Sequence, residues 1–163
     1  MIDKKAEHMT ALSGKEMVSK SHERIIFRGL VDSLEEEVIE AQVLAMEKGN
    51  EKLCNYFGEI LDCLRSIMAA DVKDEPLPPF TIFGMDSDTI RLKSHDSGKF
   101  EIPNYSHGIL AARINTLRTS VRELELCAVK VYESKREDIV LYLNRLSSAL
   151  WWLYGQFING RHL

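Results

Sequence analysis

Hydrophobic side chains recur at steps of three and four residues along four long stretches of the chain, which is the spacing of one face of an α-helix. We expect a first helix from 21–23 to about 48 and a second from about 51 to 70. A third helix is predicted over 107–134 and a fourth over 136–159. Four helices of this length favour an all-α, up-and-down helical bundle.

Apolar residues define the face that each helix is expected to bury. In the first helix these residues are Ile26 or Phe27, Leu30, Leu34, Val38, Ala41 and Ala45. In the third helix they are Leu110, Ile114, Leu117, Val121, Leu124, Ala128 and Val131. The adjacent Trp151 and Trp152 of the fourth helix must point in different directions, so we expect one of them to face a ligand or a neighbouring subunit.

A long irregular connection is predicted between the second and third long helices. The proline-containing segment 71–79 should end the second helix before Asp71. Beyond it we expect extended pieces at 81–83 and 100–103, a short helix from Ser87 to about Ser94, and a turn at 95–98. With this short helix, the predicted fold is a five-helix bundle. An irregular connection of this length in a compact domain is usually functional.

The polar residues 1–20 show no strong period, so we assign them to an N-terminal segment separate from the helical bundle of 21–160. A loop or short helix here could bind phosphate through backbone N–H groups and through lysines such as Lys15 and Lys20. A tail without fixed structure fits the composition equally well. No strand is predicted with conviction anywhere in the chain.

Charge and cysteine content exclude several classes of protein. The net charge of −4 gives no case for nucleic-acid binding. No apolar run reaches the roughly 20 residues that cross a bilayer, and the N-terminus lacks the apolar segment of a secretory signal. The widely spaced Cys54, Cys63 and Cys127 form no C-x-x-C, which argues against zinc and disulfides and fits a reducing cytoplasm.

The third helix also carries a polar face that holds two arginines. Arg118, Arg122 and Glu125 follow one another at helical spacing, and Asn115 lies one turn before Arg118. Stacked guanidinium groups suit phosphate oxygens, although an exposed ladder of charges would have the same spacing. Asp32 lies in the apolar start of the first helix, where an acid needs a cationic partner.

Three stretches of the chain, taken together, resemble the motifs of one enzyme family. The first stretch, 20–34, matches a pattern in which a lysine precedes a helix with the motif G-x-x-D-x-L. The matching residues are Lys20, Arg24, Gly29, Asp32 and Leu34. The second combines F-x-x-P at 100–103 with an arginine motif at Arg118, Arg122 and Glu125, and the third is L-N-R-L-S at 143–147. These motifs are similar to those of the ATP:corrinoid adenosyltransferases, and the ethanolamine-utilisation type, related to the propanediol-utilisation type, is the closer match.

The chain departs from this family pattern at several positions. Glu123 and Leu126 stand where many members have further arginines, and Ser148 replaces an acid. The T-R-x-G-D-x-G loop that holds triphosphate in the other branch is absent, as is the histidine and clustered-cysteine metal motif of some relatives. The resemblance therefore leaves the triphosphate loop unassigned and predicts no structural iron or zinc.

The resemblance implies transfer of the 5′-deoxyadenosyl group of ATP to cob(I)alamin, with Mg²⁺ assisting and triphosphate leaving. The implied catalytic residues are Arg122, Lys20, Asp32 and Arg118, with Asp32 paired to Arg118 across a subunit boundary. The implied nucleotide-binding residues are Lys20, Arg24, Arg122, Glu125 and Asn144. Phe100 would pack where the lower axial ligand of cobalamin normally lies.

The same resemblance implies a homo-oligomer, a trimer or a dimer, with sites between subunits. It also implies a cytoplasmic protein that could associate with a bacterial microcompartment. Two other functions remain open on the residues alone. One is a non-catalytic corrinoid carrier or chaperone, and the other is a helical scaffold protein whose arginine face binds an acidic partner.

Overall fold

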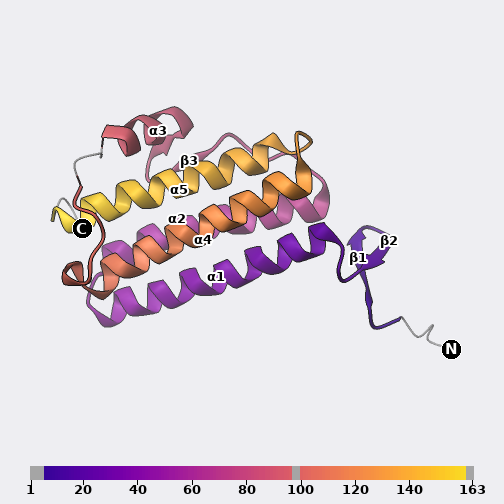
Figure 1. The fold of residues 1–163 in the computed structure, drawn as a ribbon, viewed down its shortest axis with the longest axis horizontal. Coiled ribbons are helices and arrows are strands. Elements are labelled where there is room, and N and C mark those ends of the chain that lie inside the picture. Colours follow the sequence, from indigo (N-terminus) through magenta and orange to yellow (C-terminus); the bar gives the residue numbers. More distant parts are fainter. Residues whose placement is uncertain (1–5, 97–99, 161–163) are drawn as a thin grey trace.

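A computed structural model describes residues 6–96 and 100–160. Four long helices lie side by side in an up-and-down bundle, as predicted (Figure 1). They are α1 (Glu23–Glu47), α2 (Glu51–Lys73), α4 (Gly108–Tyr132) and α5 (Glu137–Ile158). α1 packs against α2 and α4, and α5 packs against α4 and α2, which closes the bundle around one hydrophobic core.

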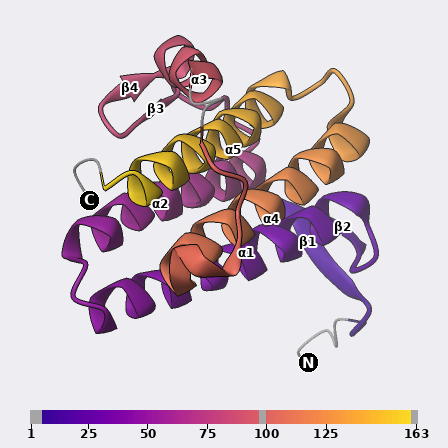
Figure 2. The ribbon, with the colours of Figure 1, turned by 60° about the vertical axis from the view of Figure 1, so that its left-hand side comes forward.

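The short fifth helix, α3 (Ser87–Asp96), lies on the outer side of α5, as both views show (Figures 1 and 2). It begins at Ser87, as predicted. A 3₁₀ turn at Tyr105–His107 leads from the connection into α4. The turn predicted at 95–98 lies partly outside the described residues.

The core consists largely of the apolar faces that the helical periodicity predicted, although Leu30 is exposed and Val131 is only partly buried. In α1 the buried residues are Phe27, Val31, Leu34, Val38, Ala41 and Ala45. Leu30 was predicted to be buried, but it is 44% exposed and its neighbour Val31 is fully buried. Both residues are apolar and one position apart, so the packing of α1 against α2 and α4 decides which of them faces the core.

The chain contains two small antiparallel hairpins, of which the first was not predicted and the second includes the extended piece expected at 81–83. The first consists of β1 (Met9–Ser13) and β2 (Glu16–Ser19), and the second of β3 (Thr81–Ile82) and β4 (Met85–Asp86). In the second hairpin Phe83 and Gly84 both have positive φ, which is the backbone of the tightest hairpin turns. The strands are short, so the fold class remains all-α.

The second helix runs past its predicted end. Asp71 is inside α2 and completely buried, and the helix stops at Asp74, whose φ of 56° is left-handed. The prolines that follow lie outside the helix and prevent a further turn. None of the helices in the described residues is long and apolar enough to cross a membrane.

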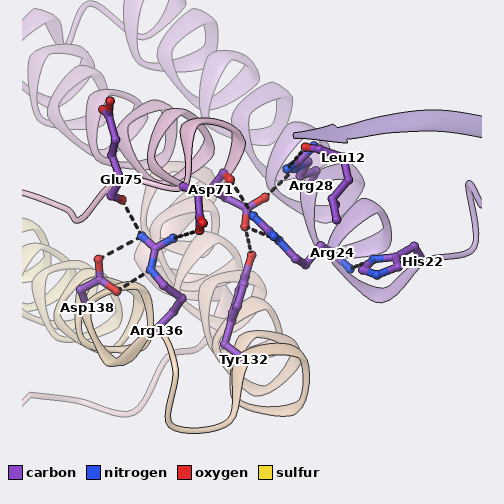
Figure 3. Close-up of polar contacts among 10 residues, drawn as sticks. Leu12, His22, Arg24, Arg28, Asp71, Glu75, Tyr132, Arg136 and Asp138 are labelled. Carbon is purple, nitrogen blue, oxygen red and sulfur yellow. Dashed lines mark hydrogen bonds and ion pairs between the residues drawn. The ribbon is translucent and has the colours of Figure 1, made fainter. Parts of the chain in front are cut away.

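Asp71 joins three helices at one end of the bundle (Figure 3). Its carboxylate accepts hydrogen bonds from Arg24 Nε at 3.0 Å, Arg28 Nε at 2.5 Å and the Tyr132 hydroxyl at 2.5 Å. Arg24 also donates to the Asp71 backbone carbonyl at 2.8 Å. Burial first, and then the bond to Asp71, raises the pKa of Tyr132, so its hydroxyl keeps its proton. A buried carboxylate is tolerated here because two guanidinium groups compensate it.

Replacing Asp71 with alanine should lower the free energy of unfolding by about 3–5 kcal/mol, because two largely buried guanidinium groups lose their counter-charge. The exposed Asp62 of the same helix provides the control, and Asp62→Ala should change stability by less than about 0.5 kcal/mol. Urea unfolding followed by circular dichroism measures both. Equal stability of the two variants would contradict the role assigned to Asp71.

Candidate functional site

A cavity of about 300 Å³ lies among α3, α4 and α5. The end of α3 and the middle turns of the two long helices supply its lining residues, which are Ser94, His95, Arg118, Arg122, Ser147, Ser148 and Trp151. Two arginines, three hydroxyl groups and an imidazole give this cavity a positive and hydrogen-bonding lining. Such a lining suits an anion with several oxygen atoms.

Arg118 is held at this cavity by neighbours other than a carboxylate in the described part of the chain. Its Nε donates to Asn115 Oδ1 at 2.9 Å, and its guanidinium carbon lies 5.2 Å from the centre of the Trp151 ring. Arg122 follows one helical turn later and remains exposed. Within the described part of the chain, neither guanidinium forms an ion pair.

Burial, and then the neighbouring charge of Arg122, lowers the pKa of Arg118. A lowered pKa means that the surroundings disfavour the positive charge of the guanidinium. A polyanion brought into the cavity would offset that penalty at Arg118. Arg118 and Arg122 line the same cavity, as their spacing on α4 predicted, and this arrangement suits an anion.

Glu125 and Asn144 meet across α4 and α5 beside the arginines. Asn144 Nδ2 donates to Glu125 Oε1 at 3.0 Å, and Arg145 donates to Asn144 Oδ1 at 2.6 Å. Arg145 Nε also donates to the Ser87 hydroxyl at 2.9 Å, which ties the pair to the start of α3. Asn144 and Glu125 line a second hollow of about 430 Å³. Sequence reasoning missed Arg145 as a supporting residue, although it lies within the L-N-R-L-S motif.

Phe100 lies against α5 next to the arginine cavity. Its ring fills the space that a side chain at Gly155 would need, so α5 has a notch at this point. The ring centre lies 6.1 Å from that of Trp151, which stacks on Tyr154 at 5.5 Å. Trp151 is thus the tryptophan that borders the cavity, while Trp152 packs against Tyr56 and Phe83.

Lys20, Arg24 and Asp32 are not among the residues that line this cavity. Lys20 is exposed at the end of β2, and that hairpin lies at the end of the bundle away from α3 (Figures 1 and 2). Arg24 is engaged by Asp71. Asp32 is exposed on α1, so the prediction that the apolar start of α1 encloses this acid is wrong for the single chain. Its pairing with Arg118 of another subunit stays a prediction.

Metal-binding side chains are not clustered in the part of the chain described. Across residues 6–96 and 100–160, no group of three or more histidine, cysteine, aspartate or glutamate side chains could hold a metal ion. Burial raises the pKa of Cys63 to about 12, with further contributions from Asp62 and Glu59. This thiol therefore stays protonated near neutral pH.

The chain belongs to the cobalamin adenosyltransferase family, because the model of that family matches residues 2–155. The corrinoid adenosyltransferase EutT of Salmonella typhimurium is 36% identical over 160 residues, which cover 92% of this chain and 58% of that protein. The protein of the same name from Escherichia coli K12 is 34% identical over the same shares of the two chains. The chain thus spans less than two thirds of the length of these relatives. No solved structure is a significant match.

Adding a methyl group at Gly155 should expel the Phe100 ring from its notch, because the added carbon and the ring would overlap. We expect Gly155→Ala to change the fluorescence of Trp151 in a Trp152→Phe background, in which Trp151 is the sole tryptophan of the chain. Gly29→Ala in the same background is the matched control, because a methyl group on this helical glycine meets nothing within 4 Å. An unchanged Trp151 spectrum in Gly155→Ala would contradict this placement of Phe100.

Proposed function

We propose that this chain transfers the 5′-deoxyadenosyl group of ATP to the cobalt of cob(I)alamin. The electron pair of Co(I) forms the bond to the 5′ carbon, and the bond from that carbon to the triphosphate oxygen breaks. The products are adenosylcobalamin and triphosphate. One observation carries the proposal. Arg118 and Arg122, which have no carboxylate partner among the described residues, lie at a cavity beside the aromatic rings of Trp151, Phe100 and Tyr154. The name of the EutT relatives, corrinoid adenosyltransferase, supports it.

In this reaction the protein mainly has to place the 5′ carbon of ATP next to the cobalt and to compensate the charge of the leaving triphosphate. Co(I) is itself the nucleophile, so no general base is needed. The leaving triphosphate gains negative charge as its bond to carbon breaks, and positively charged donors already in place stabilise that charge. Arg122 is the exposed, reachable donor of the pair, and Arg118 adds a second charge that Trp151 and Asn115 keep in position.

Asn144 and Glu125 are proposed to bind the rest of the nucleotide. Their mutual hydrogen bond and the bond from Arg145 fix the orientation of the amide before a ligand arrives. Mg²⁺ would enter with the triphosphate, since it prefers phosphate oxygens, water and one or two carboxylates. Glu125, one turn after Arg122, offers a carboxylate that fits this ion, which would neutralise part of the triphosphate charge.

Phe100 is proposed to lie against the lower face of the corrin ring. An apolar ring in that place excludes water and the lower axial ligand from the cobalt. Loss of that ligand makes Co(II) easier to reduce, because axial ligation sets the potential of such metal centres. The notch at Gly155 and the contact with Trp151 hold Phe100 close to the arginine cavity, as adenosyl transfer would require.

Lys20, Arg24 and Asp32 are proposed to act in an assembly of two or three copies. Lys20 of one copy would approach the triphosphate at the cavity of the next, and Asp32 would pair with Arg118 across that boundary. Arg24 would contribute to nucleotide binding mainly by shaping this end of α1, because Asp71 already engages its guanidinium. We also propose a cytoplasmic location and, on the ethanolamine-utilisation resemblance, association with a microcompartment.

The direct experiment mixes cob(I)alamin, ATP and Mg²⁺ with the protein and follows the absorbance of adenosylcobalamin. Product formation that depends on the protein supports the proposal, and its absence at saturating ATP refutes it. A non-catalytic corrinoid carrier with the same helical bundle would bind cobalamin through the rings of Trp151, Phe100 and Tyr154 and would not need the arginines. ATP binding that requires Arg122 would therefore exclude this alternative.

Arg122→Ala should lower the rate of adenosyl transfer by about 10²–10³-fold, the usual loss for a donor that stabilises developing negative charge. The control is Arg113→Ala on the same helix. Arg113 lies outside the cavity, and its ion pair with Glu40 is long, at 3.7 Å. Both variants should unfold close to the wild-type midpoint. A wild-type rate in Arg122→Ala would reject the arginine clamp.

Phe100→Ala should slow reactions that begin from cob(II)alamin and a reductant far more than reactions that begin from cob(I)alamin. The reason is that Phe100 is proposed to act on the reduction of Co(II) and not on the transfer itself. Ile102→Ala, at a neighbouring side chain that is 84% exposed, is the control. Equal loss from both starting states would show that Phe100 only supports the packing.

A further inference from the structure

The β1–β2 hairpin is attached to the bundle at Leu12. Most residues of the hairpin are exposed, but the Leu12 side chain is only 5% exposed. The strand register breaks at this residue, since Ala11 pairs with Met17 and Ser13 pairs with Glu16. Leu12 is therefore an extra residue in its strand, and such a bulge leaves backbone groups outside the strand ladder.

The backbone carbonyl of Leu12 is bound by a side chain of the bundle. Arg28 of α1 donates from one terminal nitrogen to Leu12 O at 2.7 Å, while its Nε donates to Asp71 at 2.5 Å (Figure 3). One guanidinium thus joins a strand of the hairpin to a buried carboxylate of α2. Because Arg24 and Tyr132 also bind Asp71, the carboxylate cannot turn, and Arg28 is fixed in direction.

The position of Lys20 follows from this attachment. Lys20 directly follows β2, and its backbone N–H donates to His8 O at 2.8 Å, which extends the hairpin pairing. α1 begins three residues later, where His22 Nδ1 accepts from the Arg24 backbone N–H at 3.2 Å. Lys20 therefore lies between two fixed points, the hairpin and the first turn of α1. Moving the hairpin would move Lys20 with it.

We infer that Arg28 is a positioning residue for the triphosphate of ATP: it clamps the hairpin to the bundle and so sets the place of Lys20. Arg28 itself touches no substrate in this scheme. The inference rests on the proposed function for the role of Lys20, but the clamp itself does not. Lysine in place of Arg28 would keep the charge and lose the fork that reaches both acceptors.

Arg136 offers a closely matched control at the same end of the bundle. Its side chain is 14% exposed, against 13% for Arg28, and it likewise joins a carboxylate, Asp138, to a backbone carbonyl, Glu75 O. It does not contact the hairpin. Arg28→Lys and Arg136→Lys therefore remove the same kind of fork, and only the first removes the tie to Leu12.

The experiment compares these two variants by hydrogen exchange and by kinetics in the full chain. Amides of 9–19 should exchange about tenfold faster in Arg28→Lys and at the wild-type rate in Arg136→Lys, as expected for the loss of one charge-assisted hydrogen bond. In Arg28→Lys, kcat/KM for ATP should fall by a similar factor while KM for cob(I)alamin stays unchanged, because Lys20 is proposed to act on the triphosphate and not on the corrin ring. Leu12→Ala, which removes the buried side chain of the hairpin, should produce the same changes. This variant replaces Arg28→Lys in the experiment if Arg28→Lys fails to fold.

A double variant tests whether Arg28 acts through Lys20. If it does, Lys20→Met combined with Arg28→Lys should bind ATP no more weakly than Lys20→Met alone. Additive losses would overturn the positioning role. Unchanged exchange of the hairpin amides in both Arg28→Lys and Leu12→Ala would overturn the clamp. A wild-type protein without adenosyltransferase activity would refute the proposed function and the role of Lys20, while the exchange data would still decide on the clamp.

Discussion

The contact of Arg118 with the face of Trp151 is the interaction on which the site depends. This guanidinium is partly buried, and among the described residues an aromatic ring and the Asn115 amide contact it in place of a carboxylate. The charge is therefore kept in position without being neutralised. α4 and α5 must pack closely for this contact to form, so the same pair of helices builds the bundle core and the arginine cavity.

Two pairs of arginines in this structure differ in whether a carboxylate compensates their charge. Arg24 and Arg28 have their charges compensated by the buried Asp71, and they serve to join helices and the hairpin. Arg118 and Arg122 have no such partner in the described residues and remain available to a ligand. The placement of one carboxylate thus separates the arginines that hold the fold from those that are proposed to bind triphosphate.

Most of the fold could be predicted from the sequence, because helical periodicity is a local signal. The misses came from interactions between distant residues. The proline-containing segment 71–79 was expected to end α2 before Asp71, but α2 continues to Lys73 and Asp71 is buried. Arg24 and Arg28, more than 40 residues away, compensate its charge. The strands of the first hairpin are short and a bulge at Leu12 interrupts one of them, so they show no clear alternation of buried and exposed positions.

The candidate site was predictable in part for the same reason. Arg118, Arg122 and Glu125 lie on one helix, and their spacing placed them together. The notch that receives Phe100 depends on Gly155, which is 55 positions further along the chain, and nothing local links the two residues. The contributions proposed for Lys20 and Asp32 would need a second copy of the chain, which the sequence of one copy does not place.

The proposal that Arg118 and Arg122 bind the triphosphate can be tested most directly by a crystal structure of the protein with ATP, Mg²⁺ and cob(II)alamin. We expect triphosphate oxygens within hydrogen-bonding distance of both guanidinium groups, with the corrin ring against Phe100. A triphosphate bound elsewhere, with both guanidinium groups directed at solvent, would contradict the central claim.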